Sequence, residues 1–275
     1  KLRTLGLRPG DIPIVQMPNT SEAMIALLAV EKVGAVPAPL GIFESAARVA
    51  QAARLVEAAA IITVEAFAGL SAALSCRDAA VEAMTVRFVA AFGRTVPEGV
   101  ASLNDWDQVE FLSKAPFPKL PGTAAALITF DETPGSLRAL SRTHEQLVAE
   151  AASAASLARV SSGSRVLATL PPVSAAGVIY GVALPLLSGA VLELNALFDS
   201  CAFGAQLGDG AKTAVILPGA AADAWQAHCA TRAVRTESVV LVHRPLPDDL
   251  SALPVGRMRR DPRTVDVLSL GEAAL

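Results

Sequence analysis

Residues 124–147 read AAALITFDETPGSLRALSRTHEQL, and this stretch decides the fold that we expect for the whole chain. It opens with an apolar run, residues 124–130, that is short enough to be a buried strand. Residues 131–136 contain a proline and a glycine, which interrupt regular structure and predict a loop. A helical pattern then begins at Thr143, a suitable N-cap residue. A strand, a polar loop and a helix start together form a cradle for phosphate, because loop amides and a helix N-terminus both favour an anion.

This stretch resembles the phosphate loop of the adenylate-forming (AMP-binding) superfamily, which includes acyl-CoA synthetases, luciferases and peptide-synthetase adenylation domains. The loop of that family reads roughly T-S-G-T-T-G-x-P-K-G-V-x-x-T-H. When the family's T-H is placed on residues 143–144, Thr133 and Gly135 match, and Arg138 stands at the lysine position. The resemblance implies a phosphate-binding site made of Thr133, Gly135, Ser136, Arg138, Thr143 and His144.

Two carboxylates depart from the family pattern inside the loop. Asp131 and Glu132 stand where the family has serine and glycine. Like charges at close range oppose binding unless a metal ion or a proton intervenes. We therefore expect the chain to bind ATP weakly or not at all.

The first part of the chain alternates between strands and helices. Apolar runs predict strands at residues 12–16, 35–40 and 59–64, and helical spacing predicts helices at residues 20–34, 45–57 and 66–83. Strands that alternate with helices of this length imply parallel pairing. The pieces G-L-R-P-G-D, M-P-N and K-V-G-A-V-P-A-P-L also follow the early region of the same superfamily, in the same order.

The later part continues the alternation, with strands expected at residues 165–169, 213–217 and 238–242 and a mostly apolar helix at residues 175–187. Residues 170–190 resemble the family segment L-P-x-x-H … G … P-L-L-x-G-A. Ser174 falls where many relatives have a histidine that lines the acyl or aryl pocket. The resemblance therefore implies a substrate pocket around Ser174, Gly177 and Tyr180.

We predict an α/β chain of two stacked subdomains, each with a mainly parallel sheet flanked by helices, as in the N-terminal domain of adenylate-forming enzymes. The expected parts are an N-terminal α/β subdomain (1–110), a linker (111–123), a second α/β subdomain with the phosphate-loop-like stretch (124–245) and a C-terminal extension without assigned structure (246–275). The extension contains a small basic patch at residues 256–260 and a weak match to the family's G-E-I segment at residues 270–274.

Composition limits the function classes. A hydrophobic content of 52% and a charged content of 18% indicate a globular chain, and the net charge of -3 gives no basic field for nucleic acid. No apolar run reaches the roughly 18 residues of a membrane span. The cysteines, Cys76, Cys201 and Cys229, are odd in number and widely spaced, which favours reduced thiols in the cytoplasm over disulfides or metal ligands.

The first hypothesis is an acyl-CoA synthetase-like ligase of the kind that serves fatty acid metabolism. The resemblance implies ATP and Mg²⁺, a carboxylic acid substrate, and CoA or a carrier-protein thiol as acceptor. The family's Y-G-x-T-E stretch, its ribose-binding aspartate and its small C-terminal domain are not found, so we expect this chain alone to be inactive. The second hypothesis is a non-catalytic acyl- or partner-binding module, and the third is an α/β domain of unrelated function.

Overall fold

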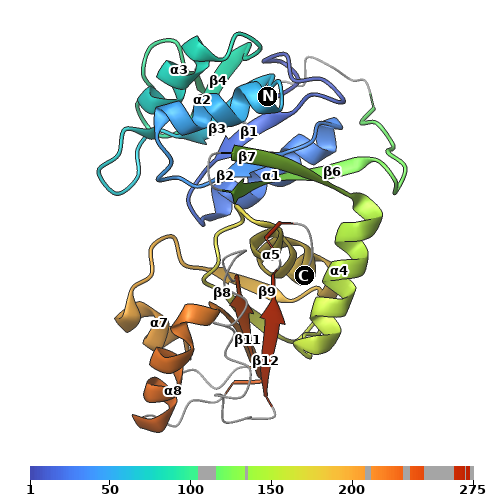
Figure 1. Ribbon diagram of the computed structural model, residues 1–275, viewed down its shortest axis with the longest axis vertical. Helices are drawn as coiled ribbons and strands as arrows, with labels where there is room; N and C mark the ends of the chain where they lie inside the picture. Colours follow the sequence, from blue (N-terminus) through green and yellow to red (C-terminus); the bar gives the residue numbers. More distant parts are fainter. Residues whose placement is uncertain are drawn as a thin grey trace. The chain divides into compact units, whose positions relative to one another are not determined.

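The computed structural model describes residues 1–104, 116–133, 136–207, 212–231, 236–244, 263–269 and 271–272, with only the backbone at Thr133 and residues 229–231. The chain forms two compact units, Lys1–Glu145 and Gln146–Leu275. The basic patch at residues 256–260 and the first five residues of the expected linker, 111–115, lie outside the described residues. Mainly parallel sheets flanked by helices are present in both units, so the predicted fold class is confirmed (Figure 1).

The first unit is built on a parallel five-stranded sheet in the order β2-β1-β3-β4-β5. Its strands are β1 (Pro13–Gln16), β2 (Ala38–Leu40), β3 (Ala60–Val64), β4 (Phe88–Phe92) and β5 (Ala101–Ser102). Its helices are α1 (Ser21–Val33), α2 (Ala46–Leu55) and α3 (Ala72–Glu82). Side chains of α2 and α3 share one core cluster with Ile14, Ile61 and Val89, whereas the buried side chains of α1 are not part of it.

Local chemistry explains where these helices begin and end. Helix α1 stops at Gly34, whose φ of 89° is the left-handed conformation that glycine adopts without a steric penalty. Helix α2 starts after Ser45, whose hydroxyl accepts a hydrogen bond from the Arg48 amide at 3.3 Å. The helix predicted at residues 66–83 is too long. Phe67 and Leu70 instead bond to each other through their backbones in a tight turn, and α3 begins only at Ala72.

A buried polar side chain fixes the loop that follows β2. Gln16 is 1% exposed, and its Nε2 donates to the carbonyl oxygens of Gly41 at 3.0 Å and Glu44 at 3.1 Å. Its Oε1 accepts from the Cys76 thiol at 2.9 Å. Both ends of the amide are therefore satisfied inside the core, as a buried polar group requires.

The stretch 124–147 forms an antiparallel hairpin of β6 (Ala125–Thr133) and β7 (Ser136–Thr143), followed by α4 (His144–Leu157). The loop predicted at residues 131–136 is therefore wrong for residues 131–133 and 136, which are paired strand residues. Phe130 and Leu137 explain the difference, because both side chains pack against the core of the first unit. The Ile128 amide also donates to the Pro37 carbonyl at 3.0 Å and joins the hairpin to the segment before β2.

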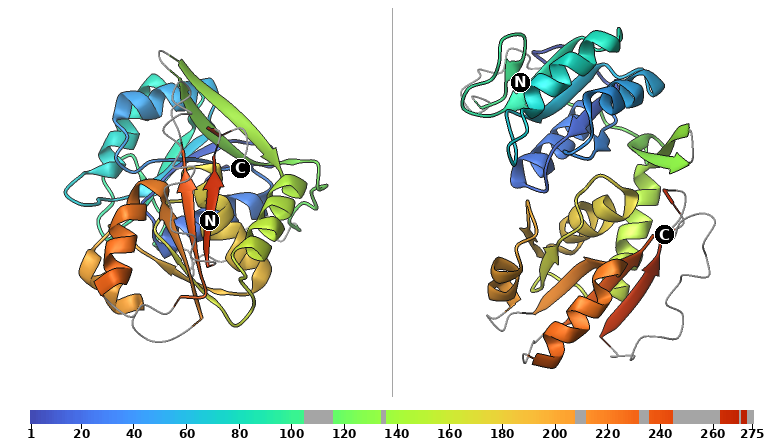
Figure 2. Two further views of the ribbon diagram at one scale, coloured as in Figure 1. Left: turned by 60° about the horizontal axis from the view of Figure 1, so that its bottom comes forward. Right: turned by 60° about the vertical axis from the view of Figure 1, so that its left-hand side comes forward.

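The second unit is built on a parallel sheet in the order β12-β11-β10-β8-β9. Its strands are β8 (Arg165–Ala168), β9 (Val191–Leu194), β10 (Thr213–Pro218), β11 (Ser238–His243) and β12 (Thr264–Leu268). Helices α7 (Ser200–Leu207) and α8 (Ala222–Thr231) lie on one side of this sheet and α4 lies on the other (Figure 2). Phe203, Trp225 and Leu241 belong to the core cluster between α7, α8 and the strands.

The apolar helix predicted at residues 175–187 is not one regular helix. It is divided into α5 (Ala175–Val178), a π-helical turn η1 (Ile179–Ala183) and α6 (Leu184–Ser188). Pro185 gives the physical reason, because proline has no N–H to continue the α-helical hydrogen-bond ladder. A short 3₁₀ turn, η2 (Gly219–Ala221), precedes α8. Across the described ranges, no helix combines the length and the apolar character that crossing a membrane requires.

Candidate functional site

The residues expected to bind phosphate are divided between the two ends of β7. Thr133 and Ser136 are paired in the ladder at the turn end of the hairpin, and Arg138 follows on the exposed part of β7. Thr143 is paired with Ala125 at the other end of the strand. The two groups are roughly 20 Å apart, because an extended strand rises about 3.3 Å per residue. The structure thus brings Ser136 and Arg138 close together, leaves Thr143 and His144 elsewhere, and does not describe Gly135.

His144 opens helix α4, and the first amides of that helix already have acceptors. The His144 amide donates to the Ala124 carbonyl at 3.2 Å, and the Glu145 amide donates to the Gly122 carbonyl at 2.9 Å. The His144 Nε2 atom is buried and has no hydrogen-bond partner among the described residues. These amides therefore hold the chain before β6, so they are not free to bind an anion.

A cavity of about 360 Å³ lies beside His144 and is lined by Leu28, Glu31, Lys32, Pro118 and Leu120. Burial raises the pKa of the Glu31 carboxyl to about 7. A carboxyl with that pKa is partly protonated at neutral pH, so it can donate as well as accept a hydrogen bond. The cavity is a half-apolar space at the C-terminal end of α1, separate from the turn end of the hairpin.

Each carboxylate of the hairpin has a basic side chain nearby. Glu132 forms an ion pair with Arg48 of α2, with 3.0 Å between Oε1 and Nη2. The Glu132 side chain is 74% exposed and the Arg48 side chain 19% exposed. Asp131 stands directly opposite Arg138 in the antiparallel ladder. Cross-strand neighbours of opposite charge stabilise a hairpin, so Asp131 contributes to the pairing of β6 with β7, whereas Glu132 connects the hairpin to α2.

These residues fit a nucleotide phosphate only in part. Ser136 and Arg138 are exposed and can donate hydrogen bonds to an anion. Asp131 and Glu132 on the same hairpin repel it. Within the described part of the chain, no three histidine, cysteine, aspartate or glutamate side chains gather into a metal-binding group.

The predicted substrate-pocket residues lie together on the segment α5–η1. Ser174 is the N-cap of α5 and accepts a hydrogen bond from the Gly177 amide at 3.1 Å. A Cβ at Gly177 would lie 2.0 Å from the Pro171 carbonyl oxygen, so only glycine fits there. Tyr180 is 3% exposed, and burial raises the pKa of its phenol to about 12. The hydroxyl of Tyr180 therefore stays protonated at any physiological pH.

Glu272 is a candidate that the sequence indicated only through the weak G-E-I match. It follows β12 at the carboxyl end of the second sheet, and its side chain is 2% exposed. Its Oε2 accepts from the Ala175 amide at 2.6 Å, and its Oε1 pairs with Arg244 at 2.9 Å. A ligand at the carboxyl ends of parallel strands would meet this carboxylate. Each oxygen already has one partner, and the positive charge of Arg244 opposes a second cation at this carboxylate.

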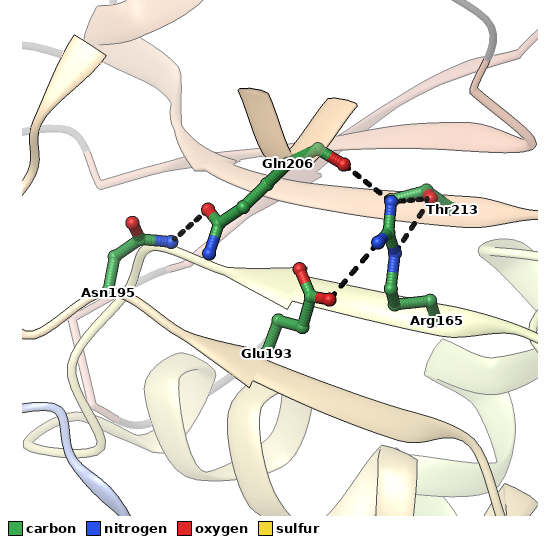
Figure 3. Close-up of polar contacts among 5 residues, drawn as sticks. All are labelled: Arg165, Glu193, Asn195, Gln206 and Thr213. Carbon is green, nitrogen blue, oxygen red and sulfur yellow. Dashed lines mark hydrogen bonds and ion pairs between the residues drawn. The ribbon is translucent and has the colours of Figure 1, made fainter. Parts of the chain in front are cut away.

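Sequence reasoning also missed a polar cluster on β8, β9, β10 and α7 (Figure 3). Arg165 donates to Thr213 Oγ1 at 3.2 and 3.1 Å and to the Gln206 carbonyl, and it pairs with Glu193 Oε1 at 3.1 Å. Asn195 Nδ2 donates to Gln206 Oε1 at 3.3 Å. Arg165 and Thr213 are the first residues of their strands, so the guanidinium joins the starts of neighbouring strands. The cluster ties the strands to α7, and no single motif in the sequence marks it.

Comparison with known proteins gives a consistent picture. The model of the AMP-binding enzyme family matches residues 1–207. The salicyl-AMP ligase / salicyl-S-ArCP synthetase of Mycobacterium tuberculosis is 29% identical over 247 residues. The matched region is 88% of this chain and 42% of that protein, so the chain spans less than half the length of this relative.

Solved structures of similar fold include the apo structure of MbtA from Mycobacterium smegmatis, with a TM-score of 0.77 and 24% identity, covering 98% of this chain and 49% of that one. The anthranilate CoA ligase AuaEII in complex with anthranoyl-AMP gives a TM-score of 0.75 at 15% identity, covering 90% of this chain and 47% of that one. At these identities the likeness concerns the fold.

Proposed function

The chain belongs to the AMP-binding enzyme family, and from that premise we propose that it is part of an ATP-dependent ligase that activates a carboxylic acid as its adenylate. The observation that carries the proposal is the family match over residues 1–207, which includes the hairpin and the α5–α6 segment. The reaction would be attack of a carboxylate on the α-phosphate of ATP, giving an acyl-adenylate and pyrophosphate, and then capture of the acyl group by a thiol.

An aryl acid is the substrate class that we favour over a fatty acid. One similar protein is named for salicyl-AMP, and one similar structure is of an anthranilate CoA ligase. The thiol acceptor would then be an aryl carrier protein or CoA, as those names suggest. We place the acid near Ser174, Gly177 and Tyr180, where the protonated Tyr180 hydroxyl could donate to a polar ring substituent.

For the nucleotide, the residues of this chain supply a limited set of donors. Ser136 and Arg138 would donate to the phosphates, with the Thr133 backbone beside them in the ladder. Bound Mg²⁺ supplies charge neutralisation of the phosphates in reactions of this type. Asp131 and Glu132 would oppose the triphosphate, so we propose that binding by this chain is weak.

A second candidate function is a non-catalytic acyl- or partner-binding module. The ion pair between Glu132 and Arg48 favours this module, because it gives Glu132 a structural role at a position where a phosphate-binding site would have to be free of negative charge. For either candidate, the free thiols of Cys76 and Cys201 support a reducing compartment such as the cytoplasm.

Calorimetric titration separates these candidates. The chain would be titrated with salicylate, anthranilate and octanoate, each with and without ATP·Mg²⁺. We expect an aryl acid to bind more tightly than octanoate, and nucleotide to bind weakly. The variant Tyr180→Phe should lose affinity for the hydroxylated acid and keep affinity for benzoate. Binding of octanoate alone would support the acyl-binding module, and binding of no acid would contradict both the ligase and the acyl-binding module.

A further inference from the structure

A second cavity, of about 680 Å³, opens at the carboxyl edge of the sheet in the first unit. Residues that follow β1, β3, β4 and β5 line it, together with the first turn of α1. Its size falls within the range of roughly 300–1,000 Å³ that is typical of small-molecule sites. None of the residues assigned above to phosphate or to the carboxylic acid lines this cavity.

The strand order explains why a crevice forms at this place. From β1 the chain passes to β2 on one side, and from β2 it passes to β3 on the other side of β1. The connections therefore leave the sheet in opposite directions between β1 and β3. Ligands of open α/β sheets bind outside the carboxyl ends of the strands at such a switch point.

The carboxylate of Glu65 is held in a fixed position in this cavity. Its Oε2 accepts a hydrogen bond from the Thr95 amide at 2.9 Å. A Cβ at Gly93 would lie 2.5 Å from the same oxygen, so the side chain of Glu65 occupies the space that glycine leaves. Asn104 in turn fixes Gly93, because its Oδ1 accepts from the Gly93 amide at 2.9 Å and its Nδ2 donates to the Gly93 carbonyl.

A second carboxylate, Glu22, lines the cavity from the first turn of α1. Hydrogen bonding by its own backbone amide and by the Ser21 hydroxyl, which donates to its Oε2 at 3.1 Å, lowers its pKa, so it is ionised at neutral pH. Arg94 is the cationic residue of the lining and is exposed. The lining therefore carries two carboxylates against one guanidinium.

The rest of the lining is largely apolar and includes Ile25, Val64, Phe67 and Phe92. A cavity that combines these apolar side chains with an excess of negative charge suits a molecule that joins a cationic head to an apolar body. Aromatic rings also attract ammonium groups through their π faces. We propose that this cavity is a binding site for a small organic amine, with its ammonium group on Glu65 and Glu22 and its apolar body against Phe67 and Phe92. This site is separate from the proposed ligase chemistry.

Three probes of similar shape test the charge requirement. The full chain would be titrated with 2-phenylethylamine, 3-phenyl-1-propanol and 3-phenylpropionate, with binding followed by NMR chemical shifts of the amides of residues 64–67 and 92–95. We expect the amine to bind most tightly and to shift these amides. Tighter binding of 3-phenylpropionate than of the amine would overturn the proposal, as would amine shifts confined to other residues.

The variant Glu65→Gln tests the residue that anchors the amine. Its amide oxygen can still accept from the Thr95 amide, so the fold should be kept while the charge is lost. We expect about tenfold weaker amine binding and unchanged binding of the alcohol, because only the amine forms a charge-assisted hydrogen bond with the carboxylate. Glu98→Gln is the matched control, because Glu98 is exposed and does not line the cavity. Equal amine affinity in the parent and Glu65→Gln, or an equal loss in both variants, would refute the assignment.

Discussion

Removing the two carboxylates of the hairpin should improve nucleotide binding. In the double variant Asp131→Ser/Glu132→Gly the repulsion between the hairpin and a phosphate chain is lost, while Ser136 and Arg138 remain as donors. At an effective dielectric of about 20, a carboxylate about 4 Å from a phosphate charge costs on the order of 4 kcal/mol before screening. Even a quarter of that for each charge gives about 2 kcal/mol, which corresponds to roughly thirtyfold in affinity.

The structure divides this effect unequally between the two residues. Glu132 is 74% exposed and paired with Arg48 at 3.0 Å, so water and the guanidinium screen its charge. Asp131 is half-buried and lies on the same face of the hairpin as its cross-strand neighbour Arg138, one of the proposed phosphate donors, so it should carry the larger share even though Arg138 offsets part of its charge. We therefore expect Asp131→Ser to improve affinity more than Glu132→Gly. Arg48→Gln should weaken nucleotide binding in the parent and have little effect once Glu132 is glycine.

The assay is calorimetric titration of ATP·Mg²⁺ into the parent, both single variants, the double variant and the Arg48 variants, with circular dichroism melting curves to confirm that each is folded. Lowering the salt concentration should enlarge the differences, because exposed charges are screened over about 10 Å at 0.1 M ionic strength. Micromolar affinity in the parent, or no gain in a folded double variant, would refute the reasoning.

Three further predictions concern stability. Arg165→Met should lower the free energy of unfolding by about 3 kcal/mol, because the substitution leaves the largely buried Glu193 without its partner. If denaturant titration gives the variant and the parent the same free energy of unfolding, this reasoning is contradicted. Gly177→Ala should destabilise the folded chain by about 1–3 kcal/mol, because the new Cβ clashes with the Pro171 carbonyl. Gly163→Ala is the control and should be nearly neutral, because no atom lies within 4 Å of its new Cβ. Equal melting temperatures in the two variants would exclude the clash. Burial raises the Glu31 pKa from 4.5 to about 7, so the contribution of Glu31 to stability is fully present below pH 4.5 and is lost as the pH rises through 7. The free energy of unfolding of Glu31→Gln should therefore increase relative to that of the parent between pH 5 and pH 8. A constant difference between the two proteins across that window would argue against a buried, titrating Glu31.

Local patterns in the sequence were sufficient for much of the fold. The alternation of apolar runs with helical spacing predicted β1, β3, β8, β10 and β11 as strands. The helices predicted at residues 20–34 and 45–57 end at Gly34 and begin after Ser45, because capping chemistry acts within a few residues. The order of the motifs was sufficient to indicate the family. Such features can be predicted from the sequence, because each depends on residues that are close together in the chain.

Only the tertiary structure decided how the candidate site is arranged. The sequence around Asp131 and Glu132 predicts a loop. In the structure, Phe130 and Leu137 pack against the core of the first unit, and the two strands of the hairpin stay paired through residues 131–133 and 136. Glu272 meets Ala175 across 97 positions of the chain. Burial, the ion pair of Glu132 and the charge balance of the cavity around Glu65 depend on segments that are distant in sequence. No local pattern encodes these contacts, because their free energy comes from packing partners that only the folded chain brings together.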